Sequence, residues 1–188
     1  MDLTNTVFEI GTGDISIYRT AIKMAALIKE YSPLPEIRRV VEGIVSTVEP
    51  YQSKEEAKAI YDYVQLNVHY IKDPLNFEYI KTPSKLIYEI EVENNAYGDC
   101  DDQTVLGLTL CRAIGFPTAI KVTSYSQDRE FSHVYGLVLV DGYWIPFDTI
   151  KSDFDFGEEQ GDSKHPFPMI TRFSVIDVES VPSFIYFL

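Results

Sequence analysis

Residues 97–102 of the chain read YGDCDD and place a single cysteine among three aspartates. The thiolate is the reactive and metal-binding form of cysteine, and nearby negative charge disfavours it because like charges raise the pKa of a thiol. The stretch is therefore compatible with three interpretations. It is a metal site, an incidental acidic turn, or a nucleophile whose surroundings offset the repulsion.

The residues that follow predict a helix that begins at this cysteine. Asp99 is a suitable N-cap and puts Cys100 at the first helical position, where unpaired backbone N–H groups and the helix dipole favour a thiolate. Asp101 and Asp102 suit a first helical turn, and neighbouring helical side chains diverge by about 100°. The acidic neighbours thus do not exclude a reactive thiol, although a lone cysteine is more often a small buried apolar residue.

A second set of reactive side chains belongs to a predicted hairpin. Asp141-Gly142 is typical of a two-residue turn, here between strands at 133–140 and 143–150. In that register His133 and Asp148 lie on the same face as diagonal neighbours, within reach of a hydrogen bond. A nucleophile, a base and a group that orients the base form the catalytic triad, and Cys100, His133 and Asp148 have the required residue types. The alternative for His133 is a strand-end histidine bonded to a surface carboxylate.

The elements that must position these residues follow from periodicity and capping signals. Apolar spacing and caps predict helices in the first part of the chain, and β-branched, alternating stretches predict strands in the second part, with an acidic loop at 152–166. This order indicates an α+β fold in which a helical N-terminal half packs on an antiparallel β-sheet. The expected helices are 14–31, 35–48, 53–68, 83–90 and 100–114, and the expected strands are 118–125, 133–140, 143–150 and 171–178.

Length and charge limit the classes of function. The chain has 188 residues, 45% of them hydrophobic, and a net charge of −13, which disfavours nucleic acid and anionic membranes as partners. It contains neither an apolar run of the roughly 20 residues that span a bilayer nor a signal peptide, so we expect a cytoplasmic protein. Cys100 and Cys111 would lie about 16 Å apart on one helix, too far for a disulfide, and are expected to be free thiols.

Together, these motifs resemble the transglutaminase-like superfamily of cysteine enzymes. The resemblance runs from Ala57 to about Ile150 and rests on VQLNVHYIKDP, TPSKLIYE, GDCDDQTVLGLTLCRAIGFPT and SHVYGLVLVDGYWIPFDT. The family has the order Cys, His, Asp, which maps onto Cys100, His133 and Asp148, with Trp144 and Pro146 in its WxPxD pattern. The resemblance implies a papain-like, transglutaminase-like core at 53–150 within a single domain 1–188. Residues 1–52 would be a helical leader similar to those of phage- or prophage-encoded members, and 151–188 an acidic loop with a C-terminal strand or tail.

The resemblance also implies thiol-dependent acyl transfer without a cofactor. Cys100 would attack an amide or ester carbonyl of a protein or peptide substrate, His133 would move the proton, and Asp148 would hold the imidazole. Hydrolysis is favoured over cross-linking because water is always available. The Cys100 N–H would contact the oxyanion, with Gln65 as a weaker candidate for the second donor and Trp144 as a candidate for the cleft wall. The chain departs from the family in its Asp101-Asp102 pair and in Lys121, which stands where an arginine is common.

Other residues allow competing interpretations. The carboxylates could bind calcium, but the acidic stretch at 153–159 fits a calcium loop poorly, and no cysteine–histidine spacing indicates zinc. His69 is expected at a helix end, His165 in a loop and Cys111 in the core. The second function considered is a structural or assembly protein, virion- or prophage-associated, that binds a protein partner through its apolar C-terminal tail, VPSFIYFL. The carboxylates considered for calcium are Asp99, Asp101, Asp102, Asp153, Asp155, Glu158 and Glu159.

Overall fold

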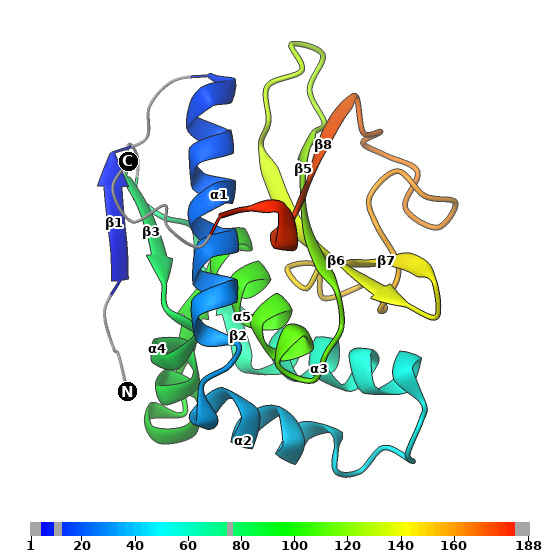
Figure 1. Ribbon diagram of the computed structural model, residues 1–188. Coiled ribbons are helices and arrows are strands. Elements are labelled where there is room, and N and C mark those ends of the chain that lie inside the picture. Colours follow the sequence, from blue (N-terminus) through cyan, green and yellow to red (C-terminus); the bar gives the residue numbers. More distant parts are fainter. Residues whose placement is uncertain (1–4, 10–12, 75–76, 183–188) are drawn as a thin grey trace.

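The protein is a layer of helices packed against a four-stranded antiparallel sheet (Figure 1). The computed structural model describes residues 5–9, 13–74 and 77–182. Helices precede the main sheet along the chain, so the predicted α+β class is confirmed. Among the described residues, no helix is long and apolar enough to cross a membrane.

The N-terminal helices begin and end close to their predicted limits. α1 is Asp14–Tyr31, α2 is Pro35–Val45 with its proline in the first turn, and α3 is Ser53–Asn67. α2 ends earlier than predicted, because its last buried residue is Val41 and the chain turns at residues 46–47. The Thr82 side chain caps α4, Pro83–Tyr88, and the chain continues as a π-helical segment, Glu89–Glu93.

The main sheet has the strand order β7-β6-β5-β8. Its hairpin has the predicted register, with Val140 opposite Tyr143, because Asp141 and Gly142 both adopt the positive φ of a two-residue turn. The predicted strand 143–150 is too long, however. β7 ends at Phe147, and after it the Asp148 carbonyl and the Thr149 hydroxyl bond to residues of α3 and α5. The strands are β5, Thr118–Ser124; β6, His133–Val140; β7, Tyr143–Phe147; and β8, Arg172–Asp177, which is followed by a 3-10 turn at Val178–Ser180.

Two small sheets were not predicted. β1, Asn5–Glu9, pairs antiparallel with β3, Phe77–Lys81, and β2, Val68–Tyr70, pairs parallel with β4, Ala96–Gly98. The three-residue strands β2 and β4 have no periodicity of their own to detect, and distant parts of the chain must meet before they can pair. The β2–β4 pair brings Tyr70 opposite Gly98, just before the cysteine.

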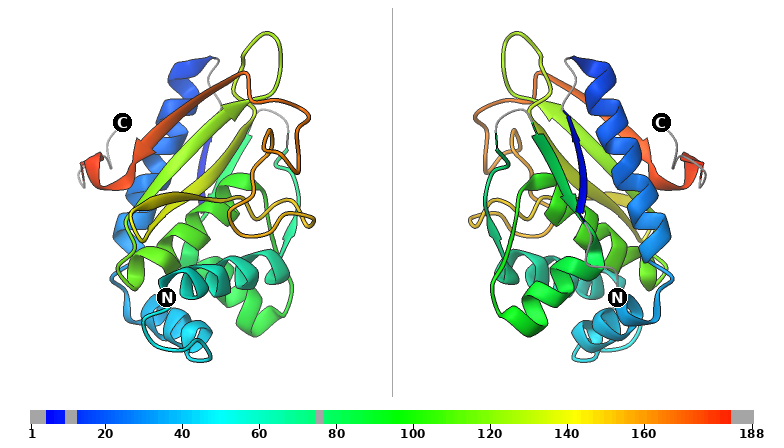
Figure 2. Two further views of the ribbon diagram at one scale, coloured as in Figure 1. Left: turned by 90° about the vertical axis from the view of Figure 1, so that its right-hand side faces the viewer. Right: turned by 90° about the vertical axis from the view of Figure 1, so that its left-hand side faces the viewer.

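α5, Cys100–Ala113, is the central helix, and its residues 101–111 are all buried, among them Cys111 as expected. It lies with α1 on one face of the sheet, while α2 and α3 pack on it from below (Figures 1 and 2). Two glycines permit close contact with the sheet, since a Cβ at Gly107 would overlap the Phe147 ring and one at Gly136 would overlap Leu108. The sheet and the cysteine helix are therefore fixed relative to each other by direct packing.

Candidate active site

Cys100 is the first residue of α5, as predicted. The Asp99 side chain accepts a hydrogen bond from the Asp101 N–H at 3.2 Å, and the Thr104 hydroxyl donates to the Cys100 carbonyl at 2.6 Å. The helix start is therefore well defined, and Cys100 remains partly exposed at it. This is the end of a helix at which the backbone dipoles favour an anion.

His133 is the first residue of β6, and its Nε2 lies 2.8 Å from Asp148 Oδ2, so the predicted hydrogen bond is confirmed. The side chains of both residues are buried. The imidazole stacks on Tyr135, with ring centres 5.4 Å apart, and its other aromatic neighbour is Tyr125 at 6.1 Å. These contacts restrict the orientation of the His133 imidazole, and a catalytic triad needs this orientation to be held.

Contacts that the sequence did not reveal fix the position of Asp148. The Tyr61 hydroxyl of α3 donates to the Asp148 carbonyl at 3.0 Å. The hydroxyl of Thr149 donates to Gln103 Oε1 of α5 at 2.9 Å, one helical turn after the cysteine. The residues around the end of β7 are thus bonded to the two helices beside it, and this explains why the strand stops there.

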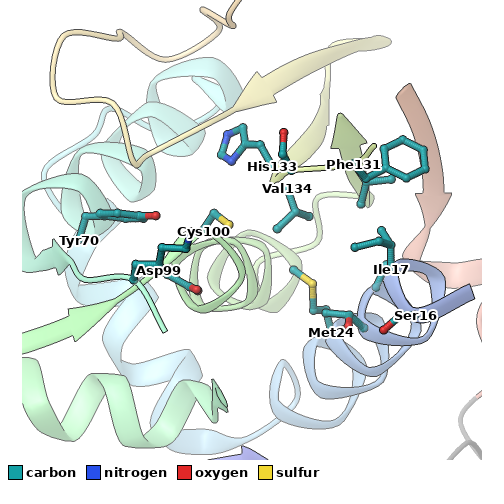
Figure 3. A pocket seen from close by; sticks show the side chains of 14 residues that line it. Ser16, Ile17, Met24, Tyr70, Asp99, Cys100, Phe131, His133 and Val134 are labelled. Atoms are coloured by element: carbon teal, nitrogen blue, oxygen red, sulfur yellow. The ribbon is translucent and has the colours of Figure 1, made fainter. Parts of the chain in front are cut away.

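Cys100 and His133 line the same cavity, which has a volume of about 370 Å³. Figure 3 shows Tyr70 and Asp99 on one side of the cysteine and Ile17, Met24 and Phe131 on the other. Tyr70, which sequence reasoning missed, lines the same cavity, and its hydroxyl points toward Cys100 (Figure 3). Its pKa is raised by burial and by the charges of Cys100 and Asp99, so the hydroxyl keeps its proton and can donate it to a hydrogen bond.

Burial changes the meaning of the acidic neighbours. It raises the pKa of Asp101 well above its ordinary value, and that of Asp102 to about 8, although the Lys81 N–H bond to Asp102 Oδ1, at 2.7 Å, opposes the shift. At neutral pH Asp102 is therefore largely protonated, and burial favours the protonated form of Asp101 as well. The negative charge around Cys100 is therefore smaller than the sequence indicates.

The free energy of unfolding should depend on Asp102. Because its native pKa is raised from 3.8 to about 8, the native protein keeps a proton that the unfolded chain releases, and stability falls as pH rises through this window. Asp102→Asn removes this titration, while its amide oxygen can still accept the Lys81 N–H. We expect the free energy of unfolding of the variant to rise relative to that of wild type as the pH rises, by up to about 1.4 kcal/mol per pH unit.

Urea denaturation at several pH values between 5 and about 8 measures this difference. Asp62→Asn, at an exposed position on α3, is the matched control and should follow wild type. Parallel pH dependences of Asp102→Asn and wild type would contradict a protonated Asp102.

The structure separates the two weaker site predictions from the cavity. The Gln65 amide donates to the carbonyls of Lys151 at 2.9 Å and Phe154 at 3.1 Å, so it tethers the 151–154 loop rather than facing the cysteine. Trp144 lies opposite Leu139 in the hairpin, is 46% exposed, and does not line the cavity. For both residues, the position along the chain did not determine the direction of the side chain.

Potential metal ligands occur together at Asp99, Asp101 and Asp102, whose ligand atoms lie within 4.8 Å of one another. Burial favours the protonated forms of two of them, which suits a cation poorly. The acidic loop is less suited to bind a metal, because Glu158 pairs with Lys164 and His165, and Glu159 pairs with Lys121. The two other histidines lie outside the cavity. His165 lies in this loop, as expected, and His69 lies exposed on β2, beyond the helix end predicted for it.

Comparison with known proteins agrees with this geometry at the level of the family. The family model of the transglutaminase-like superfamily core matches residues 38–149, more than half of the chain. No curated protein matches the sequence. The predicted phage or prophage origin stays a prediction.

Two solved structures are similar over large parts of the chain. One, from Cytophaga hutchinsonii and provisionally named a cysteine protease, aligns over 92% of this chain and 58% of its own, with 18% identity and a TM-score of 0.49. Another, from Parabacteroides distasonis and provisionally named a protease, aligns over 68% of this chain and 26% of its own, with 14% identity and a TM-score of 0.46. The chain thus spans only part of the length of each.

Proposed function

The chain belongs to the transglutaminase-like superfamily, and we propose that it is a cysteine peptidase or amidase that hydrolyses a peptide or amide bond through Cys100, His133 and Asp148. One observation carries the proposal. A cysteine at a helix N-terminus and a histidine bonded to a buried aspartate line a single cavity. These are the nucleophile, base and orienting group of thiol-dependent acyl transfer.

The first half of the reaction forms a thioester. Asp148 bonds Nε2 of His133, so Nδ1 is the nitrogen that takes the proton from the Cys100 thiol. The sulfur attacks the carbonyl carbon, and the oxyanion accepts hydrogen bonds from the Cys100 N–H and the Tyr70 hydroxyl. His133 then gives its proton to the leaving amine as the C–N bond breaks.

The second half returns the free enzyme. His133 takes a proton from water, the hydroxide attacks the thioester carbonyl, and the carboxylic acid leaves as sulfur regains its proton. Asp148 stabilises the imidazolium that forms in each half, as the aspartate of a triad does. The partly exposed thiol supports water as the acceptor, because cross-linking needs a thioester that water does not reach.

A covalent acyl group on Cys100 is the direct test. Incubation with the p-nitrophenyl ester of an N-blocked amino acid should release nitrophenol and add the acyl mass to Cys100, located by peptide mapping. Cys111 is fully buried, and burial strongly raises the pKa of its thiol, so it should react more than about tenfold more slowly.

The matched variants are Cys111→Ala, which should acylate like wild type, and Cys100→Ala, which should not acylate. A protein that carries the acyl group on lysines, or on Cys111, would refute the proposed nucleophile. The assembly function has no such observation behind it, since residues 183–188 of the apolar tail lie outside the described residues.

A further inference from the structure

One wall of the cavity comes from a helix outside the family core. Ser16, Ile17, Thr20, Ala21 and Met24 of α1 line it, and this spacing places them on a single helix face. α1 ends at Tyr31, before the matched region begins at residue 38. The proposed catalytic residues therefore lie in the matched region, whereas this wall comes from a helix that precedes it.

The wall is held in place by β8, which also lies outside the matched region. Arg172 donates to both carboxylate oxygens of Asp14, at 3.0 and 2.6 Å, and the Tyr18 hydroxyl donates to Ser174 Oγ at 3.1 Å. The guanidinium of Arg172 also lies 4.3 Å from the centre of the Phe131 ring, a cation–π contact. Phe131 lines the cavity, so one arginine joins α1, β8 and the cavity wall.

The cavity is apolar where α1 borders it. Ile17 and Met24 face Val134 and Phe131 across it (Figure 3). Met24 and Ala21 are fully buried and form its floor, while the polar residues that α1 contributes are the uncharged Ser16 and Thr20. The charged lining residues, Asp99 and Lys72, belong to the segments beside Cys100 and Tyr70.

We propose that this face of α1 is the specificity wall of the enzyme, and that it binds an uncharged, apolar side chain of the acyl donor while the reacting carbonyl meets Cys100. The inference rests on the proposed function, whose nucleophile it uses. A volume of about 370 Å³ accommodates a leucine- or phenylalanine-sized side chain with its adjoining backbone. Contact with apolar walls favours such groups over glycine, and the absence of a charged group on the α1 wall disfavours lysine and glutamate.

The test uses acetyl-X chloromethyl ketones, in which X is glycine, leucine, phenylalanine, glutamate or lysine. Each probe alkylates a thiol, with a new S–C bond and loss of chloride. We expect the leucine and phenylalanine probes to inactivate Cys100 about 10- to 200-fold faster than the glycine probe. The glutamate and lysine probes should show no such gain.

Two variants of α1 separate the wall from general packing. Met24→Ala deepens the floor and should shift the ratio of rates from the leucine probe toward the phenylalanine probe. The control, Leu27→Ala, removes a buried side chain of the same helix that does not line the cavity, and it should leave this ratio unchanged. Thr20→Phe, at a partly exposed position, avoids a loss of core packing and should reduce the preference for leucine, while the exposed control Arg19→Phe should not.

The outcomes distinguish the two proposals. Equal rates for all five probes, each well above the rate with a small-molecule thiol, would overturn the specificity wall and leave the nucleophile intact. A Cys100 that reacts no faster than the small thiol would overturn the proposed function and the wall with it. A leucine preference that persists unchanged in Met24→Ala and Thr20→Phe would also overturn the wall.

Discussion

Replacing His133 with glutamine should lower the hydrolysis of an activated ester about 10²- to 10⁴-fold, the usual contribution of a general acid–base group. Glutamine retains an amide donor for the buried carboxylate of Asp148, so the fold loses less than it would with alanine. The reason for the loss is chemical. The variant lacks the imidazole that takes the proton from the thiol and returns it to the leaving group.

The chain offers a matched control for this variant in His165, which also bonds a carboxylate, Glu158, at 3.1 Å, but lies in the loop away from the cavity. His165→Gln should keep the wild-type rate. The readouts are the rate of nitrophenol release and the rate of Cys100 alkylation, each followed against pH. If His133→Gln and wild type share one pH profile and one rate, His133 is not the base.

Adding one methyl group to the central helix should lower the free energy of unfolding. A Cβ at position 107 would overlap the Phe147 ring and lie 3.0 Å from its Cζ, in a region that is fully buried. Although alanine favours a helix by about 1 kcal/mol over glycine, overpacking of this kind costs about 1–3 kcal/mol, and the ring cannot move without shifting Asp148 beside it. We therefore expect Gly107→Ala to be less stable than wild type and to lose activity as well.

Gly43→Ala on α2 is the control, because a Cβ there has nothing within 4 Å. It should stabilise the protein by about 0.5–1 kcal/mol, the ordinary gain for alanine over glycine in a helix. Urea denaturation of both variants and of wild type gives the comparison. A Gly107→Ala protein at least as stable as wild type would show that α5 and β7 are not in the close contact described above.

The sequence was sufficient wherever the cause of a structure is local. The start of α5 follows from an aspartate cap and the apolar residues after it, and the hairpin register follows from Asp141 and Gly142, which determine the pairing of the strands on either side. Because register also decides which side chains share a face, the hydrogen bond between His133 and Asp148 could be predicted before the fold was known. The catalytic roles of these residues, and the division of the chain into domains, stay predictions.

Features that depend on distant segments were beyond sequence reasoning. β2 reaches the site only by pairing with β4, so the position of Tyr70 could not be predicted, and the direction of the Gln65 side chain is set by a loop 86 residues away. The end of β7 was missed for the same reason, since the Asp148 carbonyl and the Thr149 hydroxyl find partners on α3 and α5.

The acidic stretch around Cys100 shows most clearly which features the sequence determined and which ones the tertiary structure decided. The sequence determined that Cys100 stands at a helix N-terminus among carboxylates, because capping and helical periodicity are properties of neighbouring residues. Only the tertiary structure decided whether those carboxylates carry a proton or a negative charge. It buries Asp101 and Asp102 in the first turn of α5. Burial raises their pKa values because a charged group loses its hydration there. It also decided that α1, far from the cysteine in sequence, borders the cavity, because packing joins surfaces regardless of their separation along the chain.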